Sequence, residues 1–87
     1  MDEQLDALAE HLQATAERPV ERTASRWLGE AEAVAVDLAE SDLNPSVRQD
    51  RLSKVEHLLD NVEETGDEQA DEHVAAAREI VAALRPS

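Results

Sequence analysis

The sequence predicts an all-α protein folded as an antiparallel up-down-up-down four-helix bundle, and three observations lead to this prediction. Charged residues make up 33% of the chain, and only two Gly and three Pro interrupt a composition rich in Ala, Glu, Leu and Arg, which favour helix. Apolar residues recur every three or four positions in four segments. The connections between these segments are short, which favours antiparallel neighbours. A three-helix bundle with a loosely docked N-terminal helix is the alternative.

The first predicted helix spans residues 2–17. Its apolar face consists of Leu5, Leu8, Leu12 and Ala16. Pro19 predicts a break near Arg18, because the residue before a proline disfavours the helical conformation. The sequence leaves open whether residues 18–24 form a loop or a kinked helix.

The second predicted helix spans residues 23–40, with Thr23 or Ser25 as its N-cap. Its inner stripe consists of Ala24, Trp27, Leu28, Ala31, Val34, Ala35 and Leu38. Gly29 lies inside this helix, where glycine costs about 1 kcal/mol relative to alanine. We therefore expect another helix to approach closely beside Trp27.

The third and fourth predicted helices span residues 45–65 and 67–84. Asn44 before Pro45 is a good N-cap followed by proline at the first helical position. Gly66 is a natural left-handed stop, and Asp67 then caps the last helix. The inward positions are Val47, Leu52, Val55, Leu59 and Val62 in the third helix and Ala70, Val74, Ala77, Val81 and Leu84 in the fourth. All four helices are expected to form one domain over residues 1–87.

The formal net charge of −13 is large for 87 residues and indicates adaptation to high salt. The acidic residues are spread along the whole chain, which favours a habitat signature over one acidic binding face. At about 1 M salt the Debye length is only ~3 Å, so long-range steering by charge is weak. The chain has no cysteine, no apolar run long enough to span a bilayer, and no signal-peptide pattern at its N-terminus. We expect a cytoplasmic protein that does not enter the membrane.

Residues that could perform chemistry are sparse. No Gly-rich loop, Tyr or Cys is present, and no Ser lies in a recognisable nucleophile motif, so we expect no enzyme activity and no cofactor. The three histidines are His11, His57 and His73, and no Glu-x-x-His motif accompanies them. We therefore predict no metal site. The alternative is a metal- or ligand-binding bundle that uses His57 or His73 with nearby carboxylates.

The basic residues are scarce and lie mostly in two rows. Arg18, Arg22 and Arg26 precede Trp27, and Arg48, Arg51 and Lys54 begin the third helix. The starts of these two helices lie at opposite poles of an antiparallel bundle, about 25 Å apart at ~1.5 Å per residue. The rows therefore do not form one basic face, and nucleic-acid binding is not expected. We expect the first row to neutralise the acidic residues around Gly66, which the topology places at the same pole.

Trp27 is the only aromatic residue and has two interpretations, as a core anchor or as part of an interface, where Trp is over-represented. Wide apolar stripes without catalytic groups favour a non-enzymatic protein-interaction module. Its partner would be a second copy of the chain or another protein.

Two runs of the sequence resemble a known group of proteins. They are residues 24–35 (ASRWLGEAEAVA) and residues 65–67 (TGD) followed by 70–77 (ADEHVAAA). Together they resemble a family of short, uncharacterised helical proteins from halophilic archaea, and the similarity covers nearly the whole chain. The resemblance implies a haloarchaeal cytoplasm and supplies no activity, ligand or functional residue.

Overall fold

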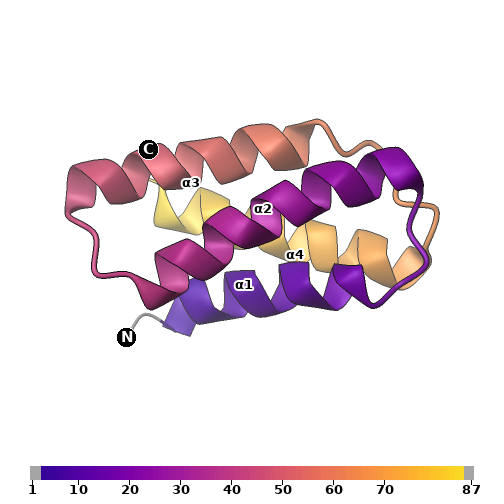
Figure 1. Ribbon diagram of the computed structural model, residues 1–87, viewed down its shortest axis with the longest axis horizontal. Helices are drawn as coiled ribbons and strands as arrows, with labels where there is room; N and C mark the ends of the chain where they lie inside the picture. Colours follow the sequence, from indigo (N-terminus) through magenta and orange to yellow (C-terminus); the bar gives the residue numbers. More distant parts are fainter. Residues whose placement is uncertain (1–2, 86–87) are drawn as a thin grey trace.

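The computed structural model describes residues 3–85 and confirms the all-α four-helix bundle (Figure 1). The helices are α1 (Glu3–Ala16), α2 (Arg22–Glu40), α3 (Pro45–Asp60) and α4 (Glu68–Leu84). Consecutive helices run in opposite directions, so the α1–α2 and α3–α4 connections lie at one pole and the α2–α3 connection lies at the other. The bundle is elongated, with extents of 36 × 22 × 18 Å.

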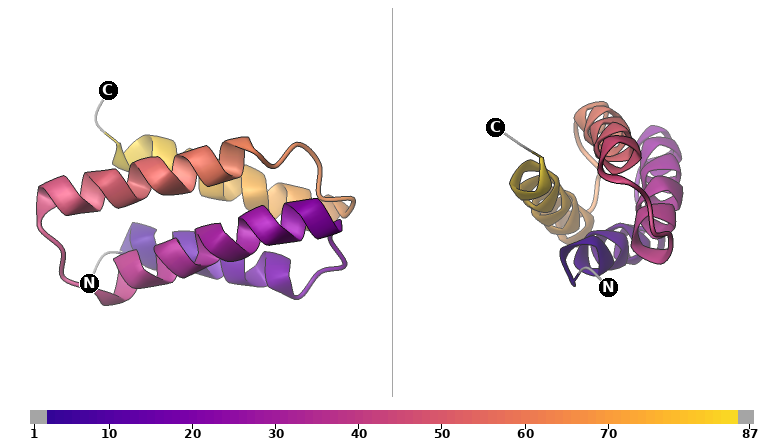
Figure 2. Two further views of the ribbon diagram at one scale, coloured as in Figure 1. Left: turned by 45° about the horizontal axis from the view of Figure 1, so that its top comes forward. Right: turned by 90° about the vertical axis from the view of Figure 1, so that its left-hand side faces the viewer.

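The helices form a closed ring in which each contacts the next and α4 contacts α1 (Figure 2). The contact between α3 and α4 is the least extensive of the four. Helix α1 packs against both α2 and α4, and its Leu8 and Leu12 side chains are fully buried. The alternative of a three-helix bundle with a loosely docked first helix is therefore wrong.

The core consists of Leu, Val and Ala side chains from all four helices. Its buried members are Leu5, Leu8, Ala9, Leu12, Ala24, Leu28, Ala31, Ala35, Leu38, Leu52, Val55, Leu58, Leu59, Val62, Val74, Ala77 and Val81. At the end of the α1 stripe Thr15 is buried and Ala16 is exposed, which differs from the prediction. The Thr15 hydroxyl donates a hydrogen bond to the Leu12 carbonyl at 2.6 Å, so its burial leaves no unpaired donor.

Two helix starts follow from local capping, as the sequence predicts. The side chain of Asn44 accepts a hydrogen bond from the Val47 N–H at 3.0 Å, and Pro45 is the first residue of α3. Asp67 accepts from the Ala70 N–H at 2.9 Å before α4. Each cap satisfies an N–H that the first helical turn leaves without a partner.

The start of α2 lacks such a cap. Its N-cap residue is Glu21, whose side chain makes no capping hydrogen bond, and the helix already begins at Arg22. The expectation of Thr23 or Ser25 as the N-cap is wrong. The open question about residues 18–24 is answered in two parts: the chain is non-helical up to Glu21 and helical from Arg22 onwards.

Helix α3 ends at Asp60, five residues before the predicted position 65. The chain then crosses to α4 as an irregular segment that buries Val62 and Thr65. Val62 lies at a position that continues the apolar helical spacing, so the sequence predicted a longer helix. A buried residue in a loop cannot be distinguished from one in a helix by this spacing alone.

The two glycines have different roles. Gly66 has φ = +81° and supplies the left-handed conformation, although it lies within the α3–α4 connection and not at the end of the helix. Gly29 is exposed, and a Cβ atom added there would meet no other atom within 4 Å. The explanation of Gly29 by close approach of another helix beside Trp27 is therefore wrong.

Candidate functional site

An ion pair between Arg18 and Asp67 joins the two connections at one pole of the bundle. The Arg18 Nε donates to Asp67 Oδ2 at 2.9 Å, and Nη2 donates to Oδ1 at 3.0 Å. The Asp67 side chain is only 12% exposed, whereas that of Arg18 is 38% exposed. The hydrogen bond from Arg18 and that from the Ala70 N–H lower the pKa of Asp67, and the same pair raises the pKa of Arg18.

Thr65 organises the rest of this pole, a role that the sequence pattern does not predict. Its N–H and hydroxyl both bond to Asp71 Oδ1, at 3.1 and 2.7 Å, and its hydroxyl accepts from the Asp67 N–H at 3.1 Å. Its carbonyl accepts from the Glu21 N–H at 2.6 Å. The buried Thr65 thus fastens the α3–α4 connection to α4 and to the start of α2. A Thr six residues before an Asp gives no signal in sequence, because the contact depends on the path of the loop.

The other two arginines of the first row behave differently from Arg18. Arg22 and Arg26 are exposed, and among residues 3–85 no carboxylate lies within ion-pairing distance of either side chain. Within residues 3–85, Arg18 is therefore the arginine of this row that forms an ion pair with the acidic pole.

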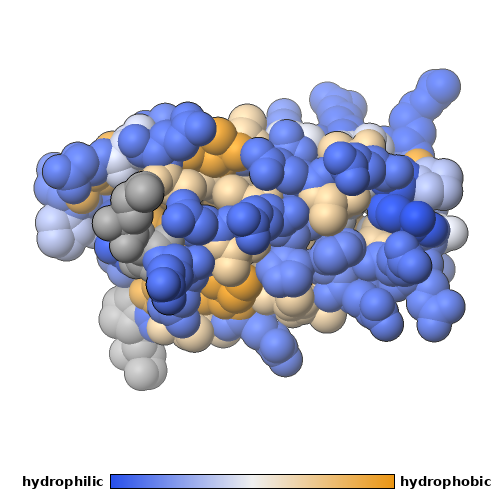
Figure 3. Space-filling view, turned by 90° about the horizontal axis from the view of Figure 1, so that it is seen from below, coloured by the Kyte–Doolittle hydropathy of each residue, from blue (hydrophilic) through white to orange (hydrophobic). Residues whose placement is uncertain are grey.

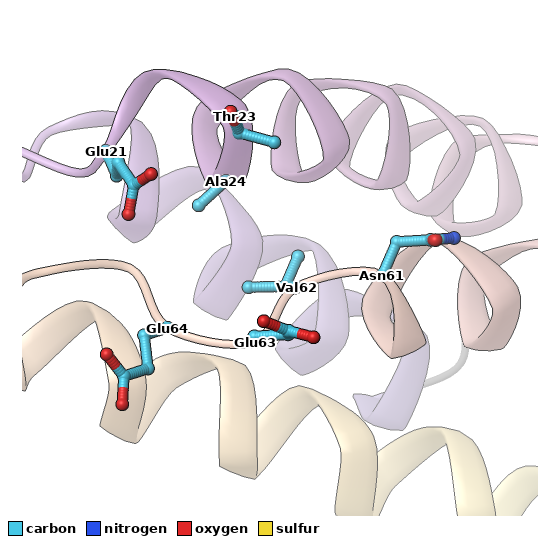
Figure 4. A pocket seen from close by; sticks show the side chains of 7 residues that line it. All are labelled: Glu21, Thr23, Ala24, Asn61, Val62, Glu63 and Glu64. Carbon is cyan, nitrogen blue, oxygen red and sulfur yellow. The ribbon is translucent and has the colours of Figure 1, made fainter.

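A groove lies at the same pole, between the first turn of α2 and the segment that follows α3 (Figure 4). Its volume is about 640 Å³, and it is lined by Glu21, Thr23, Ala24, Asn61, Val62, Glu63 and Glu64. Carboxylates therefore dominate its polar lining. The groove offers an anionic, open surface and contains no imidazole that could act with the Thr23 hydroxyl in nucleophilic catalysis.

Two histidines that are 62 positions apart meet where α1 packs against α4. The Nδ1 atoms of His11 and His73 lie 2.9 Å apart, with ring centroids at 5.2 Å and an angle of 46° between the planes. Both residues are half-buried, whereas His57 is exposed on α3. His73 therefore has an imidazole as its partner, not the carboxylate that the alternative hypothesis expected. Within residues 3–85 no group of three or more His, Asp or Glu side chains is arranged to hold a metal ion.

Trp27 is half-buried and packs against the core from one flank of α2. The opposite flank faces α1, because Gly29, Glu32 and Val36 line surface grooves together with residues of α1. Trp27 and Val34 are two turns apart on the side away from these residues, and α3 is the other neighbour of α2. Both partly exposed apolar side chains therefore lie on the face that α2 shares with α3.

A family model described as Domain of unknown function (DUF8152) matches residues 4–87. The chain belongs to this family. No curated protein and no solved structure matches the chain. In the described part of this DUF8152 member, no helix has both the length and the apolar character required to cross a membrane.

Two basic residues of α3 lie on the side that faces α2 in this DUF8152 domain. On α3, Glu56 and Asp60 line a groove with α4, so the flank that carries Arg51, Lys54 and Leu58 faces α2. Arg26 directly precedes Trp27 on α2 and is exposed. As predicted, α2 and α3, which carry the two basic rows, begin at opposite poles of the bundle.

The face of the DUF8152 domain that contains α1 has a different character (Figure 3). Seen from below, its hydrophobic side chains form separate patches interrupted by hydrophilic ones. A continuous apolar surface is thus absent from this view.

Proposed function

We propose that this protein is a non-enzymatic interaction module of a high-salt cytoplasm, and that it binds an acidic protein through the α2–α3 face. The half-buried Trp27 is the observation on which this proposal rests. In a chain with 1% aromatic residues, the largest apolar side chain is placed at the surface edge of the core and not at its centre. Partner-binding surfaces are enriched in Trp.

The charges on this face support an acidic partner. The chain has 21 acidic and only eight basic residues. Arg51 and Lys54 nevertheless lie on the flank of α3 that faces α2, whereas the acidic Glu30 lies one turn from both Trp27 and Val34 on α2. Burial of the two apolar side chains would supply affinity, and the two cations of α3 would select a partner with carboxylates around an apolar patch. In concentrated salt only charges in direct contact keep their effect, so the cations must lie next to the apolar anchor to contribute.

The acidity of the chain fits the proposed high-salt habitat. A net charge of −13 on 87 residues is explained by the need to stay hydrated in concentrated salt. The resemblance to haloarchaeal proteins points to the same setting.

A pair of valine variants tests the docking face. Val34 and Val36 are both half-buried on α2, but Val34 lies on the α3 side and Val36 on the α1 side. Tagged wild-type protein, Trp27→Ala, Val34→Glu and Val36→Glu are each used for affinity purification from haloarchaeal cells, with all washes in high salt. Circular dichroism first establishes that each variant is folded.

We expect the wild type and Val36→Glu to retain the same acidic protein, and Val34→Glu and Trp27→Ala to lose it. Retention of the same proteins by all variants would contradict the proposal. Analytical ultracentrifugation in the same buffer tests whether the protein forms a dimer. A dimer that Val34→Glu abolishes would show that this face binds a second copy of the chain and not another acidic protein.

A further inference from the structure

The geometry of the His11–His73 contact points to a second property, independent of the docking face. We propose that the two imidazoles form a two-ligand site for a divalent transition-metal ion, of the Cu²⁺ or Ni²⁺ class, between α1 and α4. The ion would be held by the Nδ1 atoms of His11 and His73, and water would complete its coordination.

The first argument is that the two nitrogens already converge. Helices α1 and α4 bring the Nδ1 atoms to 2.9 Å, although the residues are 62 positions apart. A metal ion at about 2.0–2.1 Å from each nitrogen, the usual Zn–N distance, would subtend an angle of about 90° at this separation. The rings need to turn so that both lone pairs point at the ion.

The angle selects the class of ion. An angle of about 90° matches adjacent positions of a square-planar or octahedral centre, which Cu²⁺ and Ni²⁺ prefer with nitrogen and oxygen ligands. A tetrahedral Zn²⁺ centre would require the nitrogens to be about 3.4 Å apart at the same bond length. The geometry therefore favours Cu²⁺ and Ni²⁺ over Zn²⁺.

The surroundings leave the pair free to turn and to accept water. Residues one helical turn away from His11 include Ala7 and Ala14, and those around His73 include Ala76. These small side chains limit steric hindrance to ring rotation. Both histidines are half-buried, so one side of the pair remains open to solvent.

Metal binding at this pair also balances in protons. In the contact between two neutral imidazoles, one Nδ1–H donates to the other Nδ1. When the metal binds, the donor ring carries its proton on Nε2 instead of Nδ1, and both Nδ1 lone pairs are available. No net proton is released, and no redox change is involved.

Nuclear magnetic resonance of the unmodified protein provides the direct test. Nickel chloride is added stepwise in high-salt buffer, and the ring resonances of all three histidines are followed. We expect His11 and His73 to broaden together at substoichiometric nickel, while those of exposed His57 stay sharp. Equal broadening of all three, or earlier broadening around Glu63 and Glu64, would show carboxylate or adventitious binding and overturn the proposal.

Variants provide the second test. We expect His11→Gln and His73→Gln each to weaken nickel binding, measured by calorimetry, at least about tenfold, since even loss of an outer-shell partner costs 10–100-fold. The matched control His57→Gln should bind as the wild type does. Zn²⁺ should bind more weakly than Ni²⁺ to the wild type. Unchanged affinity in the folded His11→Gln variant, or tighter binding of zinc than of nickel, would contradict the assigned site.

Discussion

Arg18 and Asp67 form a two-point ion pair that holds the α1–α2 connection against the start of α4, with N–O distances of 2.9 and 3.0 Å. The Asp67 Oδ2 atom that accepts from Arg18 also accepts from the Ala70 N–H. One carboxylate therefore caps a helix and links two parts of the chain that are 49 positions apart. The two roles can be separated, because the cap needs an oxygen and the ion pair needs a charge.

Substitution of Asp67 should reveal the two roles separately. Asn is about as good an N-cap as Asp, so Asp67→Asn removes the charge and keeps the cap, whereas Asp67→Ala removes both. We expect the melting temperature, measured by circular dichroism, to be highest for the wild type, lower for Asp67→Asn and lowest for Asp67→Ala. The difference in melting temperature between wild type and Asp67→Asn should shrink as salt is raised and should vanish when Arg18 is replaced by Gln. Identical melting of the Asn and Ala variants would show that the cap contributes nothing.

The lowered pKa of Asp67 predicts a specific dependence on pH. Because the folded-state pKa lies below the unfolded value of about 3.9, Asp67 stabilises the fold above that pH, and this stabilisation is lost as pH falls through the folded pKa. The difference in unfolding free energy between wild type and Asp67→Asn should be constant near neutrality and disappear in acid. Denaturant titrations of both proteins from neutral pH to below the folded pKa measure it. A difference independent of pH would exclude the charged form of Asp67 as its source.

The two glycines should respond to alanine in opposite directions. Gly29→Ala should raise the free energy of unfolding by up to about 1 kcal/mol, because alanine favours helix and the site has space for the methyl group. Gly66→Ala should lower it by about 1–2 kcal/mol, since φ = +81° is unfavourable for residues with a Cβ atom. Urea unfolding measures both. A loss of stability in Gly29→Ala would indicate a contact at this exposed position.

Arg78 stabilises the end of α3 from the neighbouring helix. Its Nη2 donates to the carbonyls of Leu59 and Val62, each at 2.7 Å, where the helix leaves carbonyls without intrahelical partners. We expect Arg78→Met to lower the free energy of unfolding by about 1 kcal/mol, as for the net loss of a hydrogen bond. Arg26→Met is the matched control, because Arg26 is exposed and has no ion-pair partner within residues 3–85. Equal effects of the two substitutions would contradict the assigned role.

The position of α1 in the core also has a measurable consequence. Leu12 is fully buried, so Leu12→Ala should lower the free energy of unfolding by about 2–5 kcal/mol. The half-buried Leu43, in the α2–α3 connection, provides a comparison, and Leu43→Ala should cost less. Urea unfolding of both variants distinguishes them. A Leu12→Ala cost no greater than that of Leu43→Ala would mean that α1 contributes little to the core.

Features set by neighbouring residues could be predicted from the sequence. The four amphipathic segments, the Asn44–Pro45 start of α3 and the Asp67 cap of α4 depend on spacings of three or four positions. The path of the chain after Asp60 could not be predicted in this way. The chain is stabilised on this path by two contacts with α4. Thr65 bonds to Asp71, and Arg78 bonds to the carbonyl of Val62.

The sequence by itself thus determined the all-α class, the antiparallel order of helices and the pole at which Arg18 meets the acidic residues around Gly66. Only the tertiary structure decided that His11 meets His73, that Trp27 is half-buried at the edge of the core and that Gly29 faces solvent. The physical reason is that periodicity determines which side of a helix is apolar. The rotation and axial register of two packed helices depend on the fit of all their side chains together.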